Sequence, residues 1–236
     1  MYNSYFGFRQ APFNIAPDPN FLYTNPIYQE ALTTLAYGIQ AKKGFLVLSA
    51  EVGTGKTTLL RQLMRNLHAT IHTAFIFYTQ VTFPELLRLI SHDLGLVLKG
   101  KNQLMMLQEL NNYLVEQLEK GHTVALVIDE GQKLSDDALE GLLLLSNLKT
   151  TKENLLQIIL AGQLELDVRL NRVVSTQRKQ QVAARCSLDS LGDKEIGNYI
   201  AHRLKVAGHN GPLFQRSHRR DLGLFSRKSQ VDQHHK

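Results

Sequence analysis

Residues 50–58 combine small, basic and hydroxyl side chains at a spacing that suits phosphate binding. The segment reads Ala-Glu-Val-Gly-Thr-Gly-Lys-Thr-Thr, which fits the pattern G-x-x-x-x-G-K-[ST] at every position except the first. In such a loop, Lys56 reaches the β- and γ-phosphates and the Thr57 hydroxyl ligates Mg²⁺. The expected nucleotide contacts are Ala50, Glu51, Val52, Gly53, Thr54, Gly55, Lys56, Thr57 and Thr58.

The sequence on either side of this loop is typical of a strand and a helix. Residues 45–49 form a short apolar run like that of a buried parallel strand. After the loop, Leu59, Leu63 and Leu67 recur at helical spacing. A loop between a strand end and a helix start presents free N–H groups and the positive end of the helix dipole to an anion. We therefore predict a phosphate-binding loop here, in preference to a chance glycine turn.

An acid pair, Asp129 and Glu130, directly follows the apolar strand expected at residues 123–128. Carboxylates at the end of a buried strand are costly unless they bind something, and in open α/β sheets that end faces the ligand crevice. We expect Asp129 to hold Mg²⁺ and Glu130 to orient and deprotonate the attacking water. The alternative is a pair of acids that opens a surface loop.

A polar residue, Gln163, follows the strand expected at residues 155–161 and a glycine. A polar side chain at that strand end would lie beside the strand that carries the acid pair. It could contact the γ-phosphate or the attacking water as a sensor. The alternative is an ordinary turn glutamine.

Apolar periodicity, capping residues and the glycines and prolines that end helices or strands predict the remaining elements. Further strands are expected at 73–79 and 182–188, with helices at 26–41, 82–95, 102–120 and 135–148, and a last helix capped by Asp193. We divide the chain into an aromatic and proline-rich segment packed on the body (1–25), a core (26–190), one further helix (191–211) and a basic, disordered tail (212–236). The first segment could form one wall of an adenine pocket, or it could only pack against the body of the protein.

Composition narrows the class of protein. The 236 residues carry a net charge of +6, but +4 of it lies in residues 212–236, so the body offers no clear nucleic-acid-binding face. The single cysteine, Cys186, suits a reducing compartment. Neither a signal peptide nor a membrane span is visible, so we expect a cytoplasmic protein, which a partner could hold at the inner membrane.

The order of strand, phosphate loop, helix, Asp-Glu pair and strand with Gly-Gln resembles an AAA+ ATPase. Local strings narrow the resemblance to the ExeA family, the general secretion pathway protein A type of ATPase, which is related to transposition regulators of the TniB and TnsC kind. These strings lie at residues 5–8, 12–13, 17–23, 30–32, 37–39, 51–58, 129–134, 160–163 and 202–204, and the resemblance covers about residues 1–214.

The resemblance implies a P-loop NTPase fold with a five-stranded parallel sheet sandwiched between helices. It also implies ATP hydrolysis with Mg²⁺, and homo-oligomers with nucleotide at the subunit contacts. The partner would be a secretion or pilus assembly machine.

Two departures from the family predict weak turnover. Gln181 stands where an arginine of the family would be the candidate finger acting on a neighbouring subunit, so that role passes to Arg178 or Arg185. After residue 214 the family continues into a helical lid with a sensor arginine, whereas this sequence turns basic and poor in apolar residues. We interpret this change as a lid that is largely missing, through a frameshift or early stop, with a genuine basic tail as the alternative.

Three other functions stay open. A transposition regulator of the TniB or TnsC type would act with DNA and a transposase. A truncated remnant would bind nucleotide with little turnover. A nucleotide kinase fits less well, because an Asp-Glu pair with a polar sensor suits attack by water.

Overall fold

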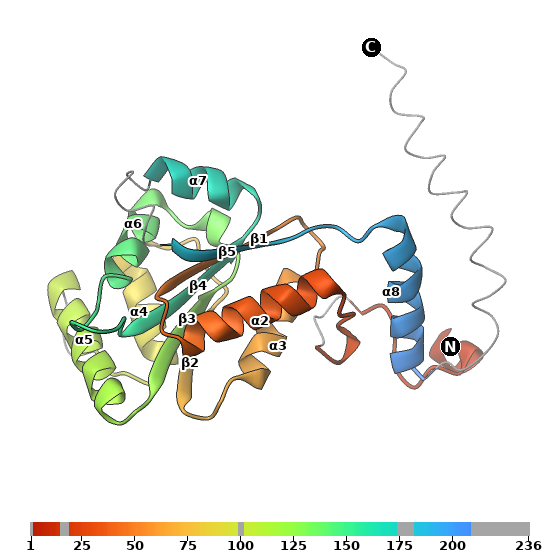
Figure 1. Ribbon diagram of the computed structural model, residues 1–236, viewed down its shortest axis with the longest axis horizontal. Helices are drawn as coiled ribbons and strands as arrows, with labels where there is room; N and C mark the ends of the chain where they lie inside the picture. The colour runs from red at the N-terminus through yellow and green to blue at the C-terminus, as the bar shows by residue number, and fades with distance from the viewer. Residues whose placement is uncertain (1, 15–18, 99–101, 174–181, 209–236) are drawn as a thin grey trace, which may run out of the picture. The chain divides into compact units, whose positions relative to one another are not determined.

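The computed structural model describes residues 2–14, 19–98, 102–173 and 182–208. Its chain divides into two compact units, one of residues 24–190 and one of residues 1–23 with those from 191 onward. Figure 1 shows the elements along the chain. The larger unit contains the phosphate loop and the acid pair.

The larger unit is built on a parallel five-stranded sheet with strand order β2-β3-β4-β1-β5. The predicted parallel sheet between helices is confirmed. The strands are β1 (Phe45–Ala50), β2 (Ile71–Ile76), β3 (Thr123–Ile128), β4 (Leu156–Gly162) and β5 (Val182–Leu188). Every residue of β1 and β4 is buried, as expected for central strands covered on both faces.

Helices cover both faces of this sheet (Figure 1). They are α2 (Pro26–Gln40), α3 (Lys56–Asn66), α4 (Phe83–Asp93), α5 (Gln103–Glu119), α6 (Asp136–Leu145) and α7 (Glu165–Val173). One face, which carries Phe45 and Val47, belongs to a core shared with α4, α5 and α6. On the other face Leu46 lies against Gly38 of α2, so successive residues of β1 serve opposite layers.

Local capping explains most helix starts. Asn25 caps α2, with its Oδ1 accepting from the Tyr28 N–H at 2.9 Å, and Ser135 caps α6, with its Oγ accepting from the Ala138 N–H at 3.1 Å. Glu85 accepts from the Thr82 N–H at 2.8 Å, as the predicted capping box requires.

Three predicted boundaries were wrong. The second strand runs from residue 71 to 76 rather than 73 to 79, because the chain then leaves the sheet and the Thr79 hydroxyl donates to the Glu130 carbonyl at 3.1 Å. Helix α6 ends at Leu145 rather than Leu148. Gly192, not Asp193, is the N-cap of the last helix, since Glu195 reaches back to the Gly192 N–H at 3.3 Å.

The smaller unit contains α1 (Tyr2–Phe6), a 3₁₀ turn η1 (Pro19–Phe21) and α8 (Asp193–Val206). Arg203 of α8 lies at its centre: its Nε donates to the Pro12 carbonyl at 2.5 Å and its guanidinium lies 4.9 Å from the Phe21 ring centroid. The N-terminal aromatic segment therefore packs on the last helix within this unit. The domain boundaries and the adenine-pocket interpretation stay predictions.

Among the described residues, no helix is long and apolar enough to cross a bilayer.

The contact between α4 and α6 yields a stability test. A Cβ built on Gly141 of α6 would lie 2.1 Å from Cδ2 of Phe83, a ring that is almost fully buried. We expect Gly141→Ala to lower the free energy of unfolding by about 1–3 kcal/mol through overpacking, although alanine favours helix by about 1 kcal/mol.

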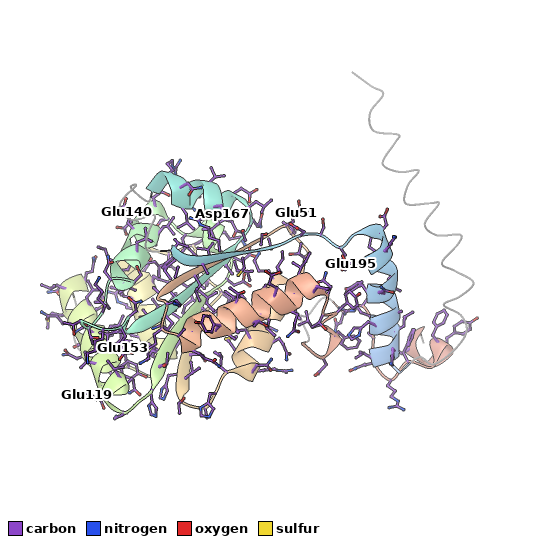
Figure 2. The ribbon with its side chains drawn as sticks, viewed as in Figure 1. Glu51, Glu119, Glu140, Glu153, Asp167 and Glu195 are labelled. Atoms are coloured by element: carbon purple, nitrogen blue, oxygen red, sulfur yellow. The ribbon has the colours of Figure 1, made fainter. Side chains whose placement is uncertain are left out.

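Denaturant unfolding would measure this change. The control is Glu140→Ala at the exposed neighbour labelled in Figure 2, for which we expect a change within about 0.5 kcal/mol. A Gly141→Ala protein as stable as the wild type would contradict the packing described here.

Candidate active site

The phosphate loop joins the end of β1 at Ala50 to the start of α3 at Lys56. Gly53 and Gly55 have φ angles of 82° and 88°, which only glycine adopts without strain. The Thr54 hydroxyl donates to the Glu51 carbonyl at 2.9 Å and closes the turn between them. The predicted loop therefore has the backbone form that its two glycines suggest, with free N–H groups at the N-terminus of α3.

The loop and the acid pair, which are more than 70 residues apart in sequence, meet at the carboxyl end of the sheet. Lys56 is 7% exposed, and its Nζ lies 3.6 Å from Oε1 of Glu130. The Thr57 hydroxyl donates to Oδ2 of Asp129 at 2.5 Å, and Asp129 is 3% exposed. The structure thus brings together four side chains that the sequence assigned to one site.

Glu130 has a left-handed backbone conformation, with φ 56° and ψ 37°. For a residue with a Cβ this costs roughly 1–2 kcal/mol. Local hydrogen bonds hold it: the Glu130 N–H donates to Oδ1 of Asp129 at 2.8 Å, and its carbonyl accepts from Thr79. Such strain is characteristic of functional sites, and here it turns the Glu130 side chain towards Lys56.

The charge state of Glu130 suits a proton acceptor. Partial burial raises its pKa, but hydrogen bonds from Lys133 and Gln132 and the charges of Lys133 and Lys56 outweigh burial and leave the pKa below its usual value. Lys133 lies 2.9 Å from Oε2 of Glu130. Glu130 is therefore ionised at neutral pH.

The donor set at Thr57 and Asp129 fits Mg²⁺. A hydroxyl and a carboxylate oxygen 2.5 Å apart are hard oxygen ligands, and Mg²⁺ usually combines one or two such ligands with substrate phosphates and water. The residues that the structure describes contain no group of three or more His, Cys, Asp and Glu that could hold a metal ion by themselves.

Gln163 follows β4, which lies between β1 and β3 in the sheet. Its half-buried side chain is therefore at the predicted edge, but its role as a sensor stays a prediction. Its backbone N–H donates to Oε1 of Gln132 at 3.1 Å, and Nε2 of Gln132 donates to Oε2 of Glu130 at 3.0 Å. Sequence reasoning missed Gln132, although its position two residues after Glu130 was the available signal.

The predicted arginine roles have less support. Arg178 and Gln181 lie outside the described residues, so their roles stay predictions. Arg185, the second candidate, lies on β5 and is paired with Asp167 of α7 in the same chain. A guanidinium held this way is less available to a neighbouring subunit.

The loop geometry yields a double-mutant prediction. A Cβ on Gly55 would lie 2.6 Å from the hydroxyl of the buried Tyr28, whereas a Cβ on Gly53 would meet nothing within 4 Å. Both positions carry the strain of positive φ, about 1–2 kcal/mol for alanine. We expect Gly55→Ala to lower the free energy of unfolding more than Gly53→Ala does.

Tyr28→Phe should recover part of the extra loss at Gly55 and none at Gly53, as a double-mutant cycle by chemical unfolding would show. Equal losses at both glycines, or no coupling to Tyr28, would mean that this contact does not shape the loop.

Comparison with known proteins agrees with this geometry. A family model described as an AAA domain matches residues 39–170. General secretion pathway protein A of Aeromonas hydrophila is 37% identical over 215 residues, which cover 91% of this chain and 39% of that protein. The resemblance stated from the sequence is confirmed, and this chain spans about two fifths of the length of that relative.

Solved structures share the fold at low identity. Cdc6p of Pyrobaculum aerophilum matches with a TM-score of 0.63 and 20% identity, over 80% of this chain and 54% of that one. The ORC2 protein of Aeropyrum pernix, solved as ADPNP-ADP complexes, matches with a TM-score of 0.58 and 16% identity, over 79% and 55%. Fold, family model and loop geometry agree: this chain belongs to the AAA domain family.

Proposed function

We propose that this chain binds ATP with Mg²⁺ at the phosphate loop and hydrolyses it. The observation that carries this proposal is the meeting of Lys56 with Glu130 and of Thr57 with Asp129 at one end of the sheet. A lysine and a hydroxyl at the start of α3 face two carboxylates that follow β3, and this arrangement suits phosphoryl transfer to water.

Each side chain has a separate task in this proposal. Lys56 leaves Glu130 and neutralises the β- and γ-phosphates. Thr57 and Asp129 would hold Mg²⁺, which when bound would stabilise the charge developing on the phosphate oxygens. Glu130, ionised and freed from Lys56, accepts the proton of the attacking water. Gln163 would contact the γ-phosphate or this water.

We further propose a homo-oligomer with nucleotide at the subunit contacts and Arg178 acting on the neighbouring site. Membership of the AAA domain family supports assembly. Similarity over 91% of the chain to general secretion pathway protein A supports coupling to a secretion or pilus assembly machine. We propose that the protein itself is cytoplasmic and that a partner can hold it at the inner membrane. Turnover stimulated by DNA would instead favour the transposition class.

The first test separates binding from hydrolysis. Lys56→Ala should abolish ATP binding, because it removes the cation that meets the phosphates. Glu130→Gln should keep binding and lower turnover by roughly 10²–10⁴, since only the general base is removed. Nucleotide titration and phosphate release would measure both, with the exposed Lys43→Ala as an unaffected control. Full turnover by Glu130→Gln would contradict the assignment of Glu130 as the general base.

The second test restores the absent arginine. A finger acting on a neighbouring subunit can contribute roughly 10³–10⁵ in turnover. We expect weak basal hydrolysis that Gln181→Arg raises at concentrations where subunits associate, while Gln180→Arg does not. An unchanged rate in a demonstrated oligomer would count against residue 181 as the finger position.

A further inference from the structure

The side-chain amide of Gln132 spans two parts of the site. Gln132 lies in the 3₁₀ turn η2 (Gly131–Lys133) directly after Glu130. Its Nε2 donates to Oε2 of Glu130 at 3.0 Å, and its Oε1 accepts from the Gln163 N–H at 3.1 Å. The amide therefore joins the carboxylate after β3 to the backbone at the end of β4.

The chemistry of these two partners fixes the orientation of the amide. A carboxylate only accepts hydrogen bonds and a backbone N–H only donates. Turning the amide over would place its oxygen against the Glu130 carboxylate and its NH₂ against the Gln163 N–H. Both contacts would then be repulsive, so one orientation is strongly favoured.

Two glycines allow η2 to pack closely against β4. A Cβ on Gly131 would lie 2.6 Å from Cδ1 of Leu160 and 3.1 Å from the Ala161 carbonyl oxygen. A Cβ on Gly162 would lie 2.9 Å from Oε1 of Gln132 itself. Both positions therefore bring the turn and the strand closer together than residues with side chains would allow.

Arg169 of α7 fixes the backbone of the same residue. Its Nη1 donates to the Gln132 carbonyl at 2.6 Å, while its Nη2 pairs with Asp136 at 2.5 Å. The Arg169 side chain is mostly buried, with 22% of its surface exposed. Through these two contacts its planar guanidinium links η2 to the start of α6. Both the main chain and the side chain of Gln132 are thus anchored.

We propose that Gln132 is the positioning residue that keeps the Glu130 carboxylate aimed at the attacking water once Lys56 has moved to the phosphates. The inference rests on the proposed function. Of the cations that hold Glu130, Lys56 would be withdrawn by nucleotide, and Lys133 is half exposed on a flexible stem, where ion pairs contribute little. Gln132 differs from Lys133 in that its amide is held at both ends, by Glu130 and by the Gln163 N–H.

Two substitutions test the two hydrogen bonds of the Gln132 amide separately; we call this pair of hydrogen bonds the bridge. Gln132→Leu removes both contacts, whereas Gln132→Glu keeps an acceptor for the Gln163 N–H but turns the donor facing Glu130 into a carboxylate. We expect both to lower kcat by about tenfold or more, a part of the full contribution of a general base. Nucleotide affinity should stay within about twofold, because Gln132 is not among the nucleotide-binding residues.

A second readout does not depend on turnover. In NMR spectra, the Gln163 amide proton should shift upfield and exchange faster in Gln132→Leu, but stay close to its wild-type shift in Gln132→Glu. The control is Gln108→Leu at an exposed position of α5, which should change neither the amide nor kcat. Lys133→Met removes a contact to the same Glu130 oxygen and should lower kcat less than Gln132→Leu does.

The outcomes are distinct. Wild-type kcat in Gln132→Glu, or an unmoved Gln163 amide in Gln132→Leu, would overturn the inference while the proposed function stands. A wild-type protein that binds but does not hydrolyse ATP would instead overturn the proposed function, and the Gln163 amide would still decide whether the bridge exists.

Discussion

A buried ammonium group needs an opposing charge, and this requirement at Lys56 governs the site. Lys56 starts α3, where the helix dipole is already positive, and its side chain is almost fully buried. Glu130 supplies the compensating charge, while Asp129 faces the neighbouring Thr57 hydroxyl. Glu130 therefore places a negative charge beside Lys56, where the proposed function puts the phosphates.

The strand order of the sheet brings the phosphate loop and the acid pair close together. The strand of the phosphate loop and the strand of the acid pair are separated by one strand, β4, and all three end at the same edge. Lys56 and Glu130 therefore meet across the end of β4, where Nζ and Oε1 lie 3.6 Å apart, and Gln163 directly follows that strand. The backbone has positive φ angles at Glu130 itself and at Gly55, which directly precedes Lys56.

Much of this was predictable from the sequence because it depends on local pattern. The glycines and lysine of the phosphate loop, the acids after an apolar strand, and strands β3 and β5 follow from residue type and spacing. Other features depend on contacts between distant segments. The early end of β2 follows from the Thr79 contact with Glu130, and the role of Gln132 depends on the room left by Gly162, which lies 30 residues further along the chain. Neither contact leaves a periodic signal in the sequence.

A crystal structure of the chain with Mg²⁺ and ADPNP would show whether Lys56 exchanges Glu130 for phosphate. We expect the phosphates to occupy the loop, Lys56 to have left Glu130 for them, and the metal to lie between Thr57 and Asp129. Gln132 would still contact Glu130, whose carboxylate would face the γ-phosphate. Nucleotide bound elsewhere, or bound with the contact between Lys56 and Glu130 intact, would contradict the account.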